Sequence, residues 1–477
     1  MLLLTRAQFL TITHALLFSS FFQHSVGSET VADDEECHIF ITVASFWFKS
    51  RSPNDGLQGL QTRQLEINWD PNLCMGNLHS VFLTSKDPQS ANFSLDGSFL
   101  DSAVCMHHPA NFYRTNVTLG RPRLPGGWDK DTVIQNEVNS ASNKPESGDH
   151  CLPYWIAGFD KSGNLLSSDC LKIRPTWMGD MKSQIAGAKV SQLMIPGTHN
   201  SGSFYGKDIQ SRGDVLYRFT RTQDEDVWEQ LVWGARYLDL RVGYYKNKKE
   251  SFWINHARER ITELRPVLQD VARFLRASPH EFVIVDFHRF PVGFSGKFQQ
   301  YAVRHRWLAN LIKEELGEFG APCVFMGSPQ LSDLWHSGKR VLVYHAERHD
   351  VHVNWNDNWL CAPLLQAWGN QQNATGLRNY MEGALHKFAG RPIPWSVMAE
   401  LTPNYSDAIL RPQRGLRMMA DDINRSVTHW FRHFWWRDAN IVATDFLLGN
   451  KIIDVAIEAN EKRFPKYEAK SYYRNFS

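Results

Sequence analysis

Polar side chains of types used in acid–base chemistry follow a series of short apolar runs between residues 191 and 445. One imidazole can take a proton from an attacking hydroxyl, another can protonate a leaving oxygen, and a guanidinium can hold phosphoryl oxygens in a fork. Singly, each residue also has a structural interpretation, such as a hydrogen-bonded histidine or a helix cap. Together they favour a site for a phosphodiester. The set is His199, Asn200, Asp239, Arg241, His256, Asp286, His288 and Asp445.

The elements that must position these side chains are strands alternating with amphipathic helices. About eight strands over roughly 300 residues favour one closed, TIM-like β/α barrel, whose catalytic groups lie at the carboxyl ends of the strands. A doubly wound sheet is the alternative, but no glycine-rich dinucleotide motif follows an early strand. Strands are predicted at residues 191–196, 236–242, 251–255, 281–287, 323–326, 340–344, 395–399 and 440–444. Helices are predicted at residues 263–278, 299–316, 376–388, 415–436 and 451–462.

The preceding segment, residues 28–176, has the short alternating runs of an all-β, sandwich-like domain. We expect no helix there and a long polar loop over residues 129–150. Five of the seven cysteines lie before residue 171, which predicts one or two disulfides in this domain, with Cys151 and Cys170 clipping a hairpin. An odd number of cysteines leaves at least one thiol free or paired between chains. The predicted strands are residues 38–43, 64–69, 80–84, 154–158 and 170–174.

The amino terminus suggests export. Residues 1–27 resemble a cleaved secretory signal, with a signal anchor as the alternative, because the apolar stretch is too short to span a bilayer. Asn-x-Ser/Thr sequons are compatible with a secreted glycoprotein. The charge balance, with Lys+Arg 52 and Asp+Glu 50, argues against a nucleic-acid partner. The sequons are at Asn92, Asn116, Asn373, Asn404, Asn424 and Asn475.

Four motifs from residue 194 onwards resemble the X domain of phosphatidylinositol-specific phospholipases C, in particular the PI-PLC X-domain-containing proteins. The first two, MIPGTHNSG at residues 194–202 and GARYLDLRV at 234–242, are highly specific as an ordered pair. WINH at 253–256, leading to VIVDFH at 283–288, and NIVATD at 440–445 complete the pattern. The likeness covers roughly residues 177–465. It assigns residues 177–477 to a catalytic barrel and says nothing of the preceding domain.

The resemblance implies a role for each matching residue. His199 is similar to the general base that takes the inositol 2-hydroxyl proton, Asp445 to the carboxylate that orients it, and His256 to the general acid on the diacylglycerol oxygen. Asp239 and Arg241 complete the implied catalytic set. The product would be an inositol 1,2-cyclic phosphate, formed from phosphatidylinositol or from glycosylated inositol lipids of the GPI type at a membrane surface.

The same resemblance bears on the metal and on the remaining residues. Calcium-dependent members carry carboxylates where this chain has Arg241, whereas metal-independent members carry an arginine there. A guanidinium in that place would repel calcium, so we expect no metal and no other cofactor. A weak calcium site formed by Asn200, Asp239 and Asp286 is the alternative. Otherwise Asn200, Asp286 and His288 are expected to bind substrate.

The sequence also allows other functions and other binding surfaces. The chain could be a lipid- or glycan-binding protein that has lost activity, or a metal-dependent glycerophosphodiesterase or sphingomyelinase-like enzyme. The histidine run at residues 345–352 has metal-like spacing but basic neighbours. Residues 290–294 are a candidate for membrane contact. In the aromatic run at residues 430–436, core packing is favoured for Phe431, Phe434 and Trp435, with lipid insertion as the alternative.

Overall fold

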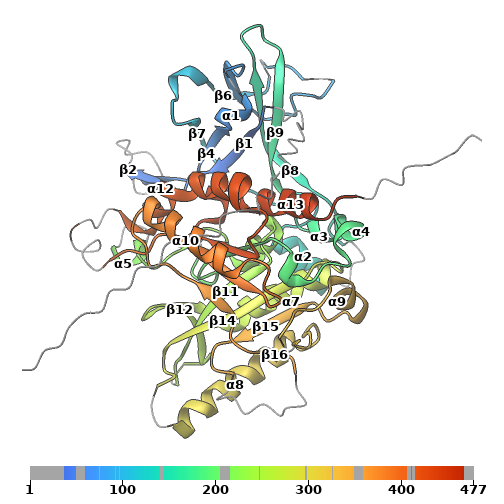
Figure 1. The fold of residues 1–477 in the computed structure, drawn as a ribbon, viewed down its shortest axis with the longest axis vertical. Coiled ribbons are helices and arrows are strands. Elements are labelled where there is room, and N and C mark those ends of the chain that lie inside the picture. The colour runs from blue at the N-terminus through green and yellow to red at the C-terminus, as the bar shows by residue number, and fades with distance from the viewer. Residues whose placement is uncertain are drawn as a thin grey trace, which may run out of the picture.

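A computed structural model gives the arrangement of the chain (Figure 1). It describes residues 37–466 with gaps at 50–59, 75, 92, 96, 140–143, 205–214, 247, 296–297, 325, 349–357, 405–409 and 411–413. The predicted secretory signal and the sequons at Asn92 and Asn475 lie outside the described residues.

Antiparallel sheets make up the amino-terminal part, as the alternating runs predicted. Residues such as Ile41 and Ile67 of the first sheet and Val81 and Ile156 of the second are fully buried, and β1 contacts β8 and β9. A three-stranded sheet has the order β1 (Ile39–Val43), β4 (Gln64–Trp69), β7 (Phe112–Thr118). A four-stranded sheet has the order β6 (Phe99–Val104), β5 (Ser80–Thr84), β8 (His150–Phe159), β9 (Leu165–Ile173). A hairpin pairs β2 (Trp47–Lys49) with β3 (Leu60–Thr62).

Two helices contradict the expectation that this part has none. Helix α1 (Pro71–Cys74) is one turn, whereas α2 (Lys130–Val138) lies in the segment predicted as a polar loop. The side chain of Asp129 accepts a hydrogen bond from the backbone of Thr132 and caps α2. Lys130 also pairs with two carboxylates of the following part, at 2.6 Å from Asp270 and 3.0 Å from Asp226. Tertiary ion pairs of this kind are not visible in a polar sequence.

The disulfide clip between Cys151 on β8 and Cys170 on β9 is confirmed. A second disulfide joins Cys37 to Cys74, and a third joins Cys323 to Cys361 in the carboxyl-terminal part. Cys105 is free and buried, which accounts for the odd number.

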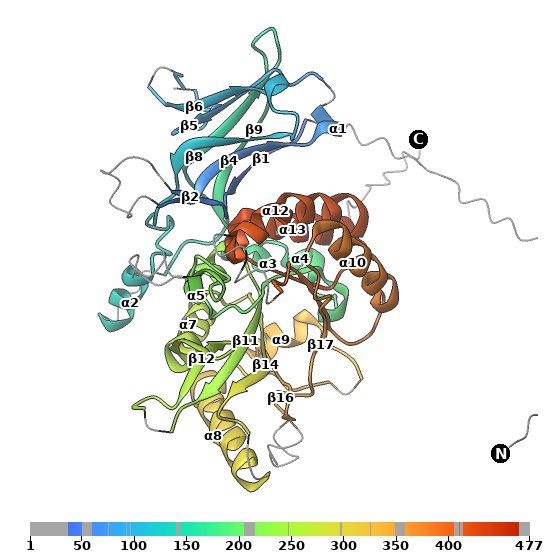
Figure 2. The same ribbon diagram turned by 90° about the vertical axis from the view of Figure 1, so that its left-hand side faces the viewer.

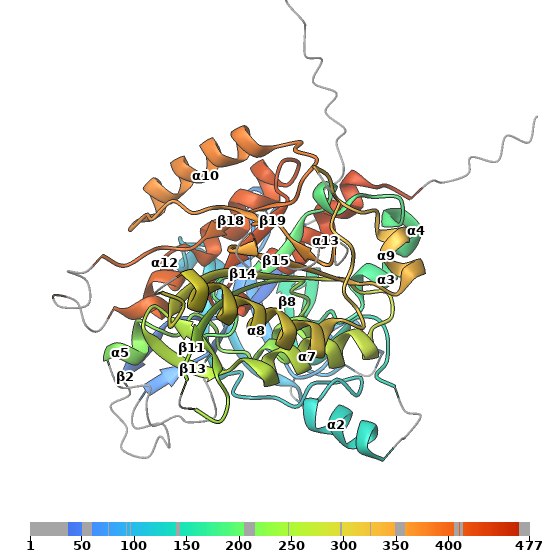
Figure 3. The ribbon, with the colours of Figure 1, turned by 90° about the horizontal axis from the view of Figure 1, so that it is seen from below.

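Parallel strands form the core of the second part. Eight of them follow the order β16-β15-β14-β11-β10-β19-β18-β17 and curl into a TIM-like half barrel, seen from below in Figure 3. No ladder joins β16 to β17 among the described residues, so hydrogen bonding does not close the barrel there. Only residues 362–364 connect these two strands, far fewer than a parallel pairing needs. The bounds are β10 Ile195–Thr198, β11 Tyr237–Tyr244, β14 Val283–Val292, β15 Val341–His345, β16 Leu360–Cys361, β17 Leu365–Ala367, β18 Trp395–Ala399 and β19 Ile441–Thr444.

Two of the predicted barrel strands are placed differently. Residues 251–255 belong to β12 (Phe252–His256), which pairs antiparallel with β11 and with β13 (Glu259–Glu263) in a hairpin beside the barrel. Of the predicted strand 323–326, the described residues 323, 324 and 326 belong to no strand. The N–H of Cys323 donates to the carbonyl of Asn358 at 2.6 Å, outside any ladder, and Met326 is 68% exposed.

Helices cover the outside of the curled sheet (Figure 3). The five predicted helices are present with small changes of boundary. No helix among the described residues is long and apolar enough to cross a membrane. The main helices are α6 Val227–Trp233, α7 Leu264–Ala277, α8 Phe298–Leu316, α9 Leu331–Ser337, α10 Ala374–Phe388, α12 Gly415–Trp430 and α13 Ile452–Arg463, and a π-helical turn, Phe431–Trp435, continues α12.

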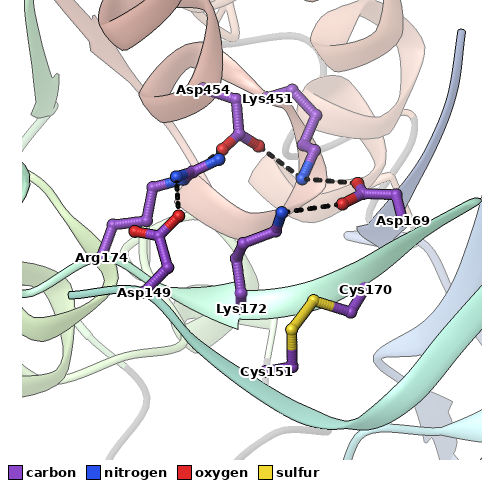
Figure 4. Close-up of a disulfide and its surroundings, with 8 residues drawn as sticks. All are labelled: Asp149, Cys151, Asp169, Cys170, Lys172, Arg174, Lys451 and Asp454. Atoms are coloured by element: carbon purple, nitrogen blue, oxygen red, sulfur yellow. Dashed lines mark hydrogen bonds and ion pairs between the residues drawn. A yellow bond between two sulfur atoms is a disulfide. The ribbon is translucent and has the colours of Figure 1, made fainter. Parts of the chain in front are cut away.

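Helices α12 and α13 lie between the amino-terminal sheets and the curled sheet (Figure 2). Ion pairs fasten this junction beside the Cys151–Cys170 disulfide (Figure 4). Asp454 of α13 accepts a 2.5 Å hydrogen bond from Arg174 and also pairs with Lys451. Asp169 of β9 lies 3.8 Å from Lys451, so the strand and the helix share one alternating charge network.

Candidate functional site

His199 lies directly after β10, at the carboxyl edge of the curled sheet. Strand β19 is the parallel neighbour of β10, so Asp445, which follows β19, comes beside it. The Nδ1 atom of His199 is 2.8 Å from Asp445 Oδ1. The side chain of Gln223 donates to the carbonyls of His199, at 3.1 Å, and Thr444, at 2.8 Å. The imidazole is therefore held in one orientation, with Nδ1–H donating to the carboxylate.

Arg241 lies on the other side of the same imidazole. It comes from β11, the other neighbour of β10, and its guanidinium is 2.6 Å from His199 Nε2 and 3.2 Å from Asp239 Oδ2. Asp239 is fully buried and also accepts the backbone N–H of Asn200 at 3.0 Å. Burial opposes ionisation of Asp239, but the charges of Arg241 and His199 outweigh it and lower its pKa to about 2. Asp239 is thus an anion that holds the guanidinium against the histidine.

Opposing influences set the basicity of His199. Burial and the Arg241 charge lower its pKa, while the carboxylates of Asp445 and Glu400 raise it, and the net pKa lies above 6.5. Because a guanidinium has no acceptor, its hydrogen bond to Nε2 requires that atom to be unprotonated. The arrangement suits a base that takes a proton at Nε2 once Arg241 is drawn away.

His256 reaches the site from the end of β12. Its Nδ1 is 2.9 Å from the carbonyl oxygen of Thr220, so this nitrogen carries the proton of the neutral ring and Nε2 is the atom left for chemistry. Burial, together with the Arg241 charge, lowers the pKa of His256 to about 3. The ring is therefore neutral at pH 7 in the absence of a bound anion.

Asp286 and His288 are two residues apart on β14, so their side chains lie on the same face of that strand. Asp286 accepts hydrogen bonds from Tyr237 at 2.9 Å and Gln366 at 3.2 Å. Burial and the charge of Asp239 raise its pKa to about 7. His288 lies 3.8 Å from Asp286, and burial lowers the pKa of His288 to about 4. Neither residue lines the cavity described next, and Asn200 and Asp239 do not line it either.

A cavity opens at this edge of the sheet, bordered by His199, Arg241, His256 and Asp445 from the predicted set. Sequence reasoning missed five polar or aromatic groups beside it. Glu400 comes directly after β18, so the strand-end argument could have found it. Arg289 adjoins His288 at the end of the predicted strand 281–287, so the same reasoning could have found it. The remaining three gave no such signal, since Gln366 and Trp368 come from the unpredicted strand β17 and its end, and Thr402 lies in the segment after β18.

Three other expectations from the sequence differ from the structure in part. In residues 290–294, Phe294 is buried at 3% exposure and, like Phe290, packs against His305, so neither ring is freely available to a membrane. In the aromatic run Phe431 and Trp435 are buried as expected, but Phe434, in the same π-helical turn, is 53% exposed.

The sequon at Asn424 is also excluded as a glycosylation site in this fold. The Asn424 side chain is 1% exposed and donates to the backbone of Asp445 at 3.3 Å. Of the metal-like histidine run, residues 349–352 lie outside the described part of the chain.

Known proteins similar to this chain are consistent with the motifs. It is 25% identical over 318 residues to the human PI-PLC X domain-containing protein 1, covering 61% of this chain and 94% of that protein. It is 28% identical over 193 residues to the variant-surface-glycoprotein phospholipase C of Trypanosoma brucei brucei, covering 35% and 52%. The phosphatidylinositol-specific phospholipase C structure from Listeria monocytogenes matches with a TM-score of 0.44 and 19% identity, covering 60% of this chain and 98% of that one. No family model matches.

The resemblance to the PI-PLC X-domain proteins is therefore confirmed. It is a similarity to phospholipase C-like proteins over somewhat more than half of the chain.

Proposed function

We propose that this protein is a secreted phosphodiesterase that cleaves inositol phospholipids by internal attack of the inositol 2-hydroxyl, without a metal ion. In this proposal, residues 177–477 form the catalytic unit and residues 28–176 a separate domain. The observation that carries the proposal is the placement of His199 between Asp445 at Nδ1 and Arg241 at Nε2. A base with a fixed tautomer and an adjacent phosphate-binding guanidinium is what this reaction requires.

Substrate binding is proposed to separate Arg241 from His199. Phosphate oxygens are anionic and accept a bidentate fork from arginine, whereas a neutral imidazole accepts a single bond. As the guanidinium moves to the phosphate, Nε2 of His199 becomes free to accept the 2-hydroxyl proton. The new O2–P bond then forms while the P–O bond to the diacylglycerol breaks, and His256 gives a proton to the departing oxygen. Water opens the cyclic phosphate with the two histidines in exchanged roles.

The acid role of His256 requires that the substrate change its protonation. A pKa of about 3 keeps the free ring neutral because the site is buried and Arg241 is close. A bound phosphate neutralises that arginine and places a negative charge beside the imidazole, and both effects raise the pKa. The proposed acid is therefore formed in the complex rather than in the free protein.

The position of Arg241 in the site supports metal independence. Three oxygen atoms in the same site could nevertheless serve as calcium ligands. Within the described residues, the Oδ1 atoms of Asn200, Asp239 and Asp286 are buried without a hydrogen-bond partner. These oxygens would serve as hard-cation ligands, but calcium takes about six to eight of them. Asp239 already binds Arg241 through Oδ2, and the pKa of Asp286 at about 7 means that it is partly protonated. The site therefore favours the guanidinium, and calcium is a weaker alternative.

The substrate is proposed to include glycosylated inositol lipids on the outer surface of cells. The three disulfides fit an oxidising compartment, and free phosphatidylinositol lies mainly in the cytosolic leaflet. This chain is similar to a phospholipase C that is named for a variant surface glycoprotein. A lipid-anchored glycoprotein should therefore be tested as a second substrate, in addition to phosphatidylinositol.

Phosphorus NMR of phosphatidylinositol vesicles, incubated with the purified protein in excess chelator, tests the proposal. We expect the signal of a cyclic phosphodiester with wild-type protein, and its formation at least about 10²-fold slower with His199→Ala or His256→Ala. His386→Ala, an exposed histidine on α10, is the matched control and should behave as wild type. A signal only with calcium would keep the enzyme and overturn metal independence. Silence with both lipids and with calcium would favour a binding protein.

A further inference from the structure

A second cluster of potential ligand side chains lies at the junction between the amino-terminal sheets and helix α12. It consists of Asp70, which follows β4, His429 in the last turn of α12, and His433 in the π-helical turn. Their ligand atoms all lie within 4.8 Å of one another. Two imidazoles and a carboxylate are a donor set suited to zinc.

We propose that Asp70, His429 and His433 bind a zinc-class divalent cation that clasps the amino-terminal sheets to helix α12. The inference is independent of the proposed function, since the cavity beside this cluster shares no lining residue with the one beside His199.

The geometry lies close to that of a metal site. Ligands at about 2.0–2.1 Å from zinc in a tetrahedron are about 3.4 Å apart, so modest side-chain rotations bring the three groups into place. Asp70 Oδ2 and His433 Nε2, now 2.6 Å apart, would separate slightly to admit the ion between them. The rings of His429 and His433 lie 4.6 Å apart, on the same side of the helix.

The carboxylate is fixed before any metal binds. Asp70 Oδ1 accepts the N–H of Asn72 at 2.9 Å, which leaves Oδ2 to face the histidines. The short helix that Asp70 caps ends at Cys74, whose disulfide to Cys37 ties it to the start of β1. Preorganised ligands of this kind reduce the entropy lost on binding.

The two histidines have few competing contacts or an unusual backbone. Among the described residues His429 contacts other rings but has no hydrogen-bond partner. A π-helical turn, a feature frequent at functional sites, carries His433.

Space and charge around the cluster also favour a cation. A cavity of about 330 Å³ opens beside the three residues and leaves room for a water as fourth ligand. Two arginines border it, but both are neutralised. Arg432 binds Glu458 with two bonds at 2.9 and 3.0 Å, and Arg425 pairs with Glu66 at 3.1 Å.

Equilibrium dialysis of the chelator-stripped full chain against Zn²⁺, with metal analysis, tests the inference, and Co²⁺ absorption reports a tetrahedral site. We expect one bound zinc in wild type and in the control His386→Gln. The group His199, Glu400 and Asp445 is a second possible metal site, so His199→Gln is included and should also keep one bound zinc. Zinc affinity should fall at least about 10²-fold in His429→Gln. Asp70→Asn, which keeps the cap, should lose about tenfold or more with folding unchanged by circular dichroism.

Three outcomes would overturn the proposal. They are no zinc bound by wild type, zinc retained in both His429→Gln and Asp70→Asn, or zinc lost in His199→Gln, which would assign the metal to the other set. Zinc should also raise the melting temperature of wild type and not that of His429→Gln, because the ion connects two parts of the fold.

Discussion

The guanidinium of Arg241 and the imidazole of His199 meet at 2.6 Å, on the ring nitrogen opposite the one that contacts Asp445. Neighbouring parallel strands bring all three residues to one edge of the sheet. The arginine contacts the nitrogen that would accept a proton, so the proposed base and the proposed phosphate ligand lie against each other in the free protein.

Replacement of Arg241 should show how much of its effect on turnover comes from its positive charge and how much from its bidentate hydrogen bonds. Arg241→Lys keeps a positive charge but loses the bidentate fork, so we expect turnover of phosphatidylinositol to fall about 10–10²-fold, and Arg241→Ala about 10²–10³-fold. Vesicle assays in chelator measure both. Equal rates for lysine and wild type would contradict the role of the fork.

A carboxylate in place of Arg241 tests the proposal that this arginine takes the place of a metal ion. Arg241→Asp should be inactive in chelator, because the phosphate loses its cation and meets a negative charge. Partial recovery with millimolar calcium would support the view that the arginine replaces a metal. Recovery without calcium would contradict it.

The pH dependence of kcat/KM should report His199. A base must be unprotonated, and the pKa of His199 is raised above 6.5, so kcat/KM should rise with pH through a midpoint above 6.5. Asp445→Asn removes a carboxylate that raises this pKa, so the midpoint should shift to lower pH while the maximal rate falls about 10²-fold or more. An unchanged midpoint would show that another group controls the acidic limb.

Arg63 should stabilise the junction between the two parts. It lies between β3 and β4 and reaches Glu225 at 2.6 Å and Asp224 at 3.4 Å, in the segment that also carries the Thr220 carbonyl contacted by His256. Arg63→Met leaves buried carboxylates without this partner, and we expect a loss of about 3–5 kcal/mol in unfolding free energy. Denaturant titration measures it. Arg276→Met, at a half-exposed surface pair, is the control, with a change below about 1 kcal/mol.

Asp454 should make stability sensitive to acid. Burial raises its pKa, but Lys451 and Arg174 outweigh this and hold the pKa far below the ordinary 3.8. For a carboxylate with a depressed pKa, the stabilisation is complete above the unfolded-state value and is lost as pH falls below it. Denaturation midpoints of wild type should thus fall between about pH 5 and 2 more steeply than those of Asp454→Asn. Parallel curves would contradict the assignment.

The sequence alone determined most of the elements and much of the site. Alternating runs and amphipathic periods predicted the strands and helices because the buried face of each element is written in its own residues. The strand-end argument placed His199, Arg241 and Asp445 together, since parallel neighbours carry their carboxyl ends to one edge.

Only the tertiary structure decided which strands belong to the sheet and what joins the two parts. Residues 251–255 and 323–326 are both predicted as barrel strands. The first belongs to a hairpin arm beside the barrel that brings in His256, and in the second Cys323 forms a disulfide with Cys361. Strand β17 with Gln366, the Asp70–His433 contact and the Arg63–Glu225 pair join residues far apart in the chain. Their energies depend on distance in space and on burial, which local periodicity does not encode.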